Sequence, residues 1–419
     1  MDHFQLKHGI LHAEDVPIDR IADEVGTPVY IYSHATLTRH ARVFRDALSV
    51  LPRVHLAFAV KSNPNLAVLK VLQREGYGAD VVSEGEMRRA LAAGMRARDI
   101  VFSGVGKSAA ELAAGLEAGI GQFNLESEEE GLELAALAAA RGIRAVAALR
   151  VNPDVEAGTH AKISTGKAEN KFGVTYDRAA EIYARLSALP GIEMRGLAVH
   201  IGSQLARLEP LRDAFARMGD LMRLLRGQGL CVTHMDLGGG LGVPYRADET
   251  FPSPAEYAAM VAEATRGWDV TLMFEPGRVI AGNTGVLVTR VIRVKAGVNC
   301  PFVVVDAAMN DLARPALYDA WHDFVAVRPN GKRMVASIVG PICESSDTFA
   351  KERDIDAVAA GDLAVFRTAG AYGATMANTY NSRPLVPEVM VDGSRYAIVA
   401  DRIDPAAILA AEHVPDWLA

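Results

Sequence analysis

Short apolar runs alternate with amphipathic stretches from about residue 54 to about residue 275. The stretches between the runs carry apolar residues at helical spacing, and two of them begin with a serine that is followed three residues later by a glutamate, a helix-capping pattern. The runs interpreted as strands are 54–60, 78–82, 100–103, 122–125, 145–151, 194–199, 234–237 and 271–274. Eight strand–helix units predict a parallel sheet and indicate closure into a (β/α)8 TIM-like barrel, with an open doubly wound sheet as the alternative.

The pattern changes after about residue 281. Val- and Ile-rich runs are then separated by loops in place of helices, which indicates a mostly-β C-terminal domain. Residues 4–12 and 29–32 also have an extended pattern and could pair with it. The predicted fold class is therefore α/β, with a barrel at 30–280 and a β-rich domain made of 1–29 plus 281–419.

Composition restricts the classes of partner. The 419 residues carry 44 basic and 51 acidic side chains, a net charge of −7, without a Lys/Arg-rich run, so we expect no nucleic-acid partner. The most apolar stretch, 132–151, is interrupted by charged residues, and the first residues lack the basic-then-apolar pattern of a signal peptide. The three cysteines are far apart and lack metal-ligand spacing. We expect a cytoplasmic protein with neither a membrane partner nor a metal site.

Polar residues end several of the predicted strands. Lys61 ends the first, His200 the sixth, Gly238–Gly240 the seventh and Glu275 the eighth. Catalytic groups of (β/α)8 barrels lie at the carboxyl ends of the strands. We therefore expect these residues to converge on one mouth of the barrel.

Lys61 follows the apolar run Ala-Phe-Ala-Val. A lysine in that position either extends its ammonium group to solvent or uses its amine inside a pocket, where desolvation makes Schiff-base chemistry accessible near neutral pH. The glycines at 238–240 and the Pro-Gly-Arg turn at 276–278 follow strands seven and eight, whose loops commonly bind phosphate in such barrels. A tight turn is the alternative for the glycines.

Three further residues have two interpretations each. Glu275 could keep a pyridine nitrogen protonated and make the ring an electron sink, or could form a salt bridge with Arg278. His200, with Ser203 close behind, could stack on a flat ring beside a phosphate, although a lone histidine at a strand end is more often structural. Cys343, in a polar segment, could exchange a proton with a carbanion; a buried inert cysteine is the alternative.

Six short motifs occur in one order along the chain: Lys-Ser-Asn-Pro-Asn (61–65), His-Ile-Gly-Ser-Gln (200–204), Gly-Gly-Gly (238–240), Glu-Pro-Gly-Arg (275–278), Cys-Glu-Ser-Ser-Asp (343–347) and Gly-Ala-Tyr-Gly (370–373). This ordered set resembles the fold-type III pyridoxal 5'-phosphate (PLP) decarboxylases, the diaminopimelate decarboxylases in particular. The resemblance covers roughly residues 15–415 and includes segments 150–154 and 162–167. It implies the barrel-plus-β-domain architecture, which alanine racemases share.

The resemblance also implies roles for matching residues. Lys61 would hold PLP as a Schiff base, Glu275 would pair with the pyridine nitrogen and His200 would stack on the ring. The residues expected around the phosphate are Ser203, Gly238, Gly239, Gly240, Gly277, Arg278 and Tyr372. The residues expected to bind the substrate are Arg278, Arg314, Tyr318, Glu344 and Tyr372. Cys343 or Lys61 would donate the final proton. Cys343 and Glu344 would reach the neighbouring subunit's site, which implies a homodimer with shared active sites.

The activity that the resemblance implies is decarboxylation of meso-2,6-diaminopimelate to L-lysine and CO2, the last step of lysine biosynthesis. A related decarboxylase acting on ornithine, arginine or carboxynorspermidine is an alternative, but Glu344 with Arg314 and Tyr318 favours a substrate that carries a second carboxylate. A decarboxylase for a carrier-bound aminoacyl group is also compatible. A non-catalytic regulatory homologue would be expected to have lost Lys61, Glu275 or Cys343, and the chain has all three.

Overall fold

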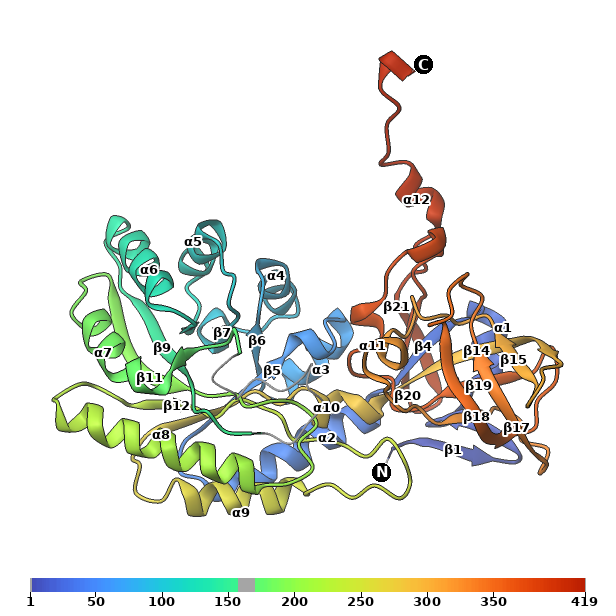
Figure 1. Cartoon of the computed structure of the whole chain (residues 1–419), viewed down its shortest axis with the longest axis horizontal. Helices are drawn as coiled ribbons and strands as arrows, with labels where there is room; N and C mark the ends of the chain where they lie inside the picture. Colours follow the sequence, from blue (N-terminus) through green and yellow to red (C-terminus); the bar gives the residue numbers. More distant parts are fainter. Residues whose placement is uncertain (1, 157–169, 419) are drawn as a thin grey trace. The chain divides into compact units, whose positions relative to one another are not determined.

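The structure, a computed structural model, describes residues 2–156 and 170–418, so segment 162–167 lies outside the described residues. The chain divides into two compact units. Unit 1 consists of Met1–Leu37, Tyr245–Glu249 and Ala281–Ala419; unit 2 consists of Thr38–Pro244 and Thr250–Ile280. Figure 1 traces both units along the chain.

Eight parallel strands close on themselves in unit 2. Each pairs with the next along the chain, and the last pairs with the first through Leu272–Val54, Met273–His55 and Phe274–Leu56. The strands are β5 (Val54–Ala59), β6 (Gly78–Val81), β7 (Ile100–Phe102), β8 (Gln122–Leu125), β9 (Ala145–Asn152), β11 (Ile192–Ala198), β12 (His234–Asp236) and β13 (Thr271–Phe274), with the short β10 (Val174–Thr175) pairing with β9. This closure confirms the predicted barrel and excludes the open sheet.

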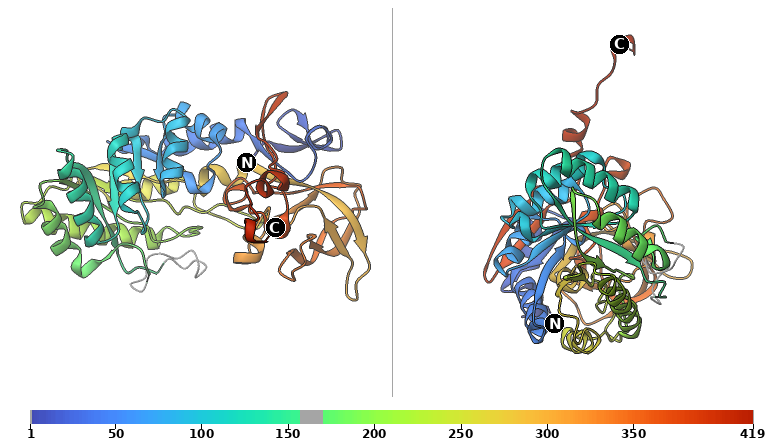
Figure 2. Two further views of the ribbon diagram at one scale, coloured as in Figure 1. Left: turned by 90° about the horizontal axis from the view of Figure 1, so that it is seen from above. Right: turned by 90° about the vertical axis from the view of Figure 1, so that its left-hand side faces the viewer.

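Helices surround the strands of the barrel (Figure 2, right-hand view). They are α3 (Leu66–Arg74), α4 (Glu84–Ala92), α5 (Ala109–Ala118), α6 (Glu128–Ala140), α7 (Tyr176–Ser187), α8 (Glu209–Gly227), α9 (Pro254–Ala264) and α10 (Arg278–Ala281), while α2 (His34–Ala47) joins the two units along the chain. Ser108 and Glu111 form the expected capping box at α5, and the Ser83 side chain accepts a hydrogen bond from the Glu86 amide at α4. These caps satisfy amide groups that a helix leaves unpaired at its first turn, so helix starts are encoded locally.

Unit 1 is built on an extended, mostly antiparallel sheet, which confirms the predicted β-rich domain. Its strand order is β18-β17-β15-β14-β4-β20-β21, and β19 pairs with both β14 and β16. The strands are β4 (Val29–Ser33), β14 (Gly285–Lys295), β15 (Phe302–Val305), β16 (Phe324–Ala326), β17 (Arg333–Val339), β18 (Thr348–Asp356), β19 (Leu363–Phe366), β20 (Glu388–Asp392) and β21 (Arg395–Ala400). The short helices α11 (Arg314–Tyr318) and α12 (Pro405–Leu409) belong to the same unit.

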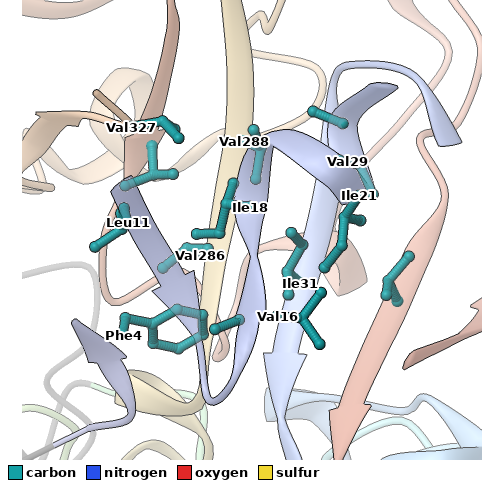
Figure 3. Close-up of a cluster of buried hydrophobic side chains, with 14 of the residues drawn as sticks. Phe4, Leu11, Val16, Ile18, Ile21, Val29, Ile31, Val286, Val288 and Val327 are labelled. Atoms are coloured by element: carbon teal, nitrogen blue, oxygen red, sulfur yellow. The ribbon is translucent and has the colours of Figure 1, made fainter. Parts of the chain in front are cut away.

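The N-terminal residues of unit 1 form a separate small sheet. Strands β1 (Phe4–Lys7), β2 (Ile10–Ala13) and β3 (Val16–Pro17) pair with one another and lead into α1 (Ile18–Val25). This element joins the main sheet through a buried apolar cluster that includes Phe4, Leu11, Val286 and Val288 (Figure 3). Residues 4–12 thus pack against the main sheet and do not extend it, contrary to the expected pairing.

The division between units differs from the predicted boundary at residue 30. Strand β4 pairs antiparallel with β14 and parallel with β20, so residues 29–33 belong to the sheet of unit 1. An extended segment forms backbone hydrogen bonds with the strands that lie beside it in the fold. The hydrophobic pattern of the segment does not predict which strands these are, so it could not assign residues 29–33 to a unit.

Among residues 2–156 and 170–418, none of the helices has the length and apolar character needed to cross a bilayer.

Candidate active site

A cavity of about 420 Å³ lies at the carboxyl ends of the barrel strands. Lys61 follows β5, His200 follows β11 and Glu275 follows β13, and all three side chains line it. Parallel strands direct their carboxyl ends to one side of a barrel, so residues far apart in the sequence meet there. The structure therefore brings the predicted amine, imidazole and carboxyl group together in one cavity.

The Lys61 amine is ion-paired. Its Nζ lies 2.6 Å from Oδ2 of Asp80, a residue of β6 whose side chain is fully buried. A carboxylate at this distance favours a charged lysine. Of the two interpretations of Lys61, the amine lies in the pocket, and the next strand supplies a counter-ion that the sequence analysis did not include.

Two more buried carboxyl groups, those of Asp236 and Glu275, share one amide. Nδ2 of Asn124 donates to Oδ2 of Asp236 at 2.8 Å and to Oε1 of Glu275 at 3.4 Å. Nε2 of Gln122 donates to Oδ1 of Asn124 at 2.8 Å, which turns the Asn124 amide nitrogen toward the two acids. The hydroxyl of Ser103 also donates to Glu275.

Burial raises the pKa of both acids. For Glu275, burial and then the negative charges of Asp236 and Asp80 raise the pKa well above that of an ordinary glutamate. The hydrogen bond between the two acids raises the pKa of Glu275 and lowers that of Asp236. The pair therefore holds a proton more tightly than an ordinary carboxyl group does, and a basic ring nitrogen beside it could share that proton.

The His200 imidazole is neutral. Burial, followed by the charges of Arg150 and Lys61, lowers the pKa of His200 well below the usual value for histidine. Its Nδ1 accepts the N–H of Gly239 at 3.2 Å. A neutral aromatic ring with one nitrogen anchored to the backbone is suited to packing against a flat ligand.

The three glycines after β12 allow neighbouring loops to approach closely. A Cβ atom on Gly239 would lie 2.2 Å from the Glu275 carbonyl oxygen, and one on Gly240 would lie 2.5 Å from that of Gly202. The N–H of Gly238 donates to Asp236, and that of Gly239 donates to His200. Both amide groups thus donate hydrogen bonds within the chain. Close packing of the loops is a second reason why glycine is required at these positions, in addition to the phosphate interpretation.

Ser203 and Arg278 meet on the loops after β11 and β13. Nη2 of Arg278 donates to Oγ of Ser203 at 3.2 Å, and the arginine is only 7% exposed. The salt bridge between Glu275 and Arg278, the alternative considered for Glu275, is not among the ion pairs of the described residues.

The remaining predicted residues, Arg314, Tyr318, Cys343, Glu344 and Tyr372, belong to unit 1. Arg314 begins α11 and is 6% exposed, while Tyr318 ends that helix half-buried. Cys343 and Glu344 are exposed, which contradicts the buried, inert interpretation of Cys343. Tyr372 has a left-handed backbone conformation, with φ of 55°.

Sequence reasoning did not single out Asp80, Ser103, Asn124 and Asp236. All four lie in or directly after a predicted strand, as Lys61 does. A polar side chain at the carboxyl end of a short apolar run could therefore have identified these residues as candidates for the site. Burying a polar group in a strand is destabilising unless a hydrogen-bonding partner lies nearby.

Comparison with known proteins identifies the family. A family model described as "Pyridoxal-dependent decarboxylase, pyridoxal binding domain" matches residues 35–282. The diaminopimelate decarboxylase of Zymomonas mobilis is 49% identical over 418 residues, 99% of each chain. That of Pseudomonas aeruginosa is 50% identical over 396 residues, 94% of this chain and 95% of the relative.

Solved structures give the same answer. The crystal structure of diaminopimelate decarboxylase from M. jannaschii in co-complex with L-lysine superposes with a TM-score of 0.96 at 32% identity, over 100% of this chain and 99% of that one. Sequence relatives and structure agree along nearly the whole length, including both units. The chain therefore belongs to the pyridoxal-dependent decarboxylases and, among them, to the diaminopimelate decarboxylases.

Proposed function

We propose that this chain removes CO2 from meso-2,6-diaminopimelate to give L-lysine, with PLP as its cofactor. The observation that carries the proposal is the cavity in which Lys61, His200 and the Asp236–Glu275 pair meet, within a chain that is 49% identical to a diaminopimelate decarboxylase along 99% of both lengths. The M. jannaschii relative, described in co-complex with L-lysine, supports the identity of the product.

The residues of the cavity fit PLP. A buried carboxyl pair with raised pKa values suits a ring nitrogen that shares a proton, and a neutral imidazole suits the ring face. An amine lies in the same cavity. The three groups correspond to the nitrogen, the face and the aldehyde of the cofactor, so we assign Glu275, His200 and Lys61 to them.

When bound, PLP supplies an electron sink for the electron pair that the departing CO2 leaves behind. Glu275 would hold a proton at the ring nitrogen, because burial and then the negative charge of Asp236 raise the pKa of Glu275. Lys61 would hold the cofactor through Nζ. Asp80, 2.6 Å from Nζ in this structure, receives the Lys61 ammonium whenever that amine is not bonded.

We assign the phosphate to a cradle of backbone and side-chain donors. The proposed residues are Ser203, Gly238, Gly239, Gly240, Gly277, Arg278 and Tyr372. The Arg278–Ser203 hydrogen bond supports two of them, because it places a guanidinium and a hydroxyl side by side. Since Gly238 and Gly239 donate their N–H groups within the chain, we expect these two to shape the loop and the others to contact the phosphate.

We assign recognition of the distal amino-carboxylate end of the substrate to Arg278, Arg314, Tyr318, Glu344 and Tyr372. A guanidinium can hold a carboxylate through two parallel hydrogen bonds, and a simple diamine precursor offers no such partner. Ornithine and lysine are therefore expected to be poor substrates.

We also propose a homodimer with shared active sites, in which Cys343 donates the final proton to the neighbouring subunit's site. The exposure of Cys343 and Glu344 in the single chain supports an intersubunit role. The cysteines Cys231, Cys300 and Cys343 are all free thiols, which is consistent with the proposed cytoplasmic location. The assignment of PLP binding to the barrel stays a proposal that the family match over residues 35–282 supports.

The test is CO2 release from a panel of meso-diaminopimelate, ornithine, arginine and lysine. We expect kcat/KM for meso-diaminopimelate to exceed the others by about a thousandfold or more, because a substrate without a second carboxylate cannot form the two parallel hydrogen bonds with a guanidinium. Comparable turnover of ornithine or arginine would favour the polyamine-pathway alternative. Survival in Lys61→Ala of the absorbance band of the lysine–PLP Schiff base, as distinct from that of the free PLP aldehyde, would contradict the role of Lys61.

A further inference from the structure

The guanidinium of Arg314 contacts the aromatic rings of Tyr245 and His322 in unit 1. Its Cζ lies over the ring of Tyr245, 4.5 Å from the centroid, and its Nη1 lies 2.9 Å from Nε2 of His322. Tyr245 and His322 also contact each other edge to face, with ring centroids 5.4 Å apart. Arg314 is thus packed on one ring and hydrogen-bonded to a second.

The hydrogen bonds define the tautomer of His322. A guanidinium can only donate, so Nε2 must be the accepting, unprotonated nitrogen. The other ring nitrogen, Nδ1, lies 2.8 Å from the carbonyl oxygen of Arg367, which can only accept. Both contacts are satisfied by one species alone, a neutral imidazole with its proton on Nδ1.

The backbone that carries His322 is itself held. Nη1 of Arg353 donates to the carbonyl oxygen of His322, and the same guanidinium lies over the Trp321 ring at 3.4 Å. Arg246 lies over that ring at 4.1 Å, and Nε1 of Trp321 donates to Asp323 at 2.6 Å. Burial lowers the pKa of Arg353 to about 10, so it remains charged near neutral pH. This network leaves His322 little freedom to change its orientation.

We infer that His322 is a positioning residue for substrate selection: it fixes the rotation of the Arg314 guanidinium, while Tyr245 fixes its plane. The inference rests on the proposed function of Arg314 as the binder of the distal carboxylate. Two-point recognition of a carboxylate requires both the plane and the rotation of the guanidinium to be set before the substrate arrives. In this role His322 acts through Arg314.

The experiment compares His322→Leu with His322→Gln in the purified holoenzyme. Leucine removes the acceptor, whereas the glutamine amide oxygen can replace Nε2. For His322→Leu we expect KM for meso-diaminopimelate to rise about 5- to 30-fold, as expected for one lost hydrogen bond, with kcat within about threefold of the parent. The cofactor's visible spectrum should be unchanged. His322→Gln should return KM to within about threefold.

His12→Gln is the matched control. His12 is a 9% exposed histidine of the same unit whose Nδ1 lies 2.9 Å from the carbonyl oxygen of Ile10. We expect its KM to equal that of the unmodified protein. A rise in KM in this control as large as that of His322→Leu would attribute the effect to general disturbance of the unit and would overturn the inference.

A double-mutant comparison isolates the pathway through Arg314. Adding His322→Leu to Arg314→Ala should leave KM as in Arg314→Ala alone, because the positioned group is already gone. An independent, multiplicative effect would overturn the inference, as would equal KM values for His322→Leu and the parent. If Arg314→Ala itself has the parent KM, the role of Arg314 is wrong. If the unmodified protein releases no CO2 from meso-diaminopimelate, the proposed function is wrong.

Discussion

At the level of single residues, the candidate site contains the buried acids Asp80, Asp236 and Glu275. Asp80 is paired with the Lys61 ammonium, whereas Asp236 and Glu275 lie together around the amide of Asn124. Burial and like charge raise the pKa of Glu275, which means that negative charge on this group is destabilising unless a positive group lies beside it. We interpret this destabilisation as the basis of affinity for a protonated ring.

Replacing Asp236 with asparagine should stabilise the cofactor-free protein. A carboxyl group whose folded pKa is raised contributes stability that is present at low pH and lost as the pH rises through the folded pKa, because the folded state then binds more protons than the unfolded state. The pKa shifts of Glu275 and Asp236 have this direction. We therefore expect Asp236→Asn to raise the free energy of unfolding more at about pH 8 than at about pH 5, as measured by urea denaturation.

The exposed Asp220→Asn serves as the control and should show no such pH dependence. The same Asp236→Asn protein should bind PLP more weakly in an absorbance titration. A variant that gains no stability at the higher pH would show that the two acids do not repel each other.

Arg314→Ala should separate substrate recognition from cofactor binding. Truncating one partner of a buried, charge-assisted pair costs about 2–5 kcal/mol, or about 30- to 4,000-fold in kcat/KM for meso-diaminopimelate. PLP affinity should remain that of the parent. Steady-state CO2 release and absorbance titration measure the two quantities, and equal losses in both would refute the distal-end role. Arg314→Lys keeps the charge but loses the planar guanidinium, so its kcat/KM for meso-diaminopimelate should lie between that of the parent and that of Arg314→Ala.

At the level of elements, glycines connect the loops that end β11, β12 and β13. The close approach of Gly239 to the Glu275 carbonyl and of Gly240 to that of Gly202 joins three consecutive loops into one rim. The hydrogen bond from Gly239 to His200 adds a second link between the first two of them. The orientation of His200 and Glu275 thus depends on backbone packing as well as on their own side-chain contacts.

Gly239→Ala should disturb this rim. The added methyl group would lie 2.2 Å from a backbone oxygen, so the loops must separate, which we expect to destabilise the protein by about 1–3 kcal/mol. PLP should bind about tenfold more weakly or worse, because His200 and Glu275 move with the loops. Urea denaturation and absorbance titration provide the readouts.

Gly227→Ala, at the end of α8 with open space around its Cα, is the matched control and should leave cofactor affinity unchanged. If PLP affinity were unchanged in Gly239→Ala as well, the loops could separate without moving His200 and Glu275, and the proposed role of the glycines would be wrong.

At the level of the whole molecule, the proposed homodimer predicts complementation. Lys61→Ala and Cys343→Ala subunits should each be nearly inactive alone, because each lacks one part of every site. Co-expressed with different tags, they should regain about a quarter of the parent activity, since half of the dimers then contain one intact site of two. Measured CO2 release that stays at the level of the separate variants would exclude shared sites.

The sequence by itself determined the barrel, the β-rich remainder and the placement of Lys61, His200 and Glu275 at strand ends. These features follow from local patterns: the periodicity of apolar residues distinguishes strand from helix, and parallel strands all end on the same side. Helix starts such as the one at Ser108–Glu111 could also be predicted from the local sequence, because a capping box is formed by two residues three positions apart.

Only the tertiary structure decided which residues are partners. The Asp80–Lys61 pair joins two neighbouring strands, and the Asn124 amide reaches acids on β12 and after β13 across the barrel interior. The membership of β4 in the sheet of unit 1 and the hydrogen bond of Arg314 to His322 were likewise set by packing. These interactions depend on burial and on the proximity of segments that are distant in the sequence. The local sequence pattern predicts neither of them.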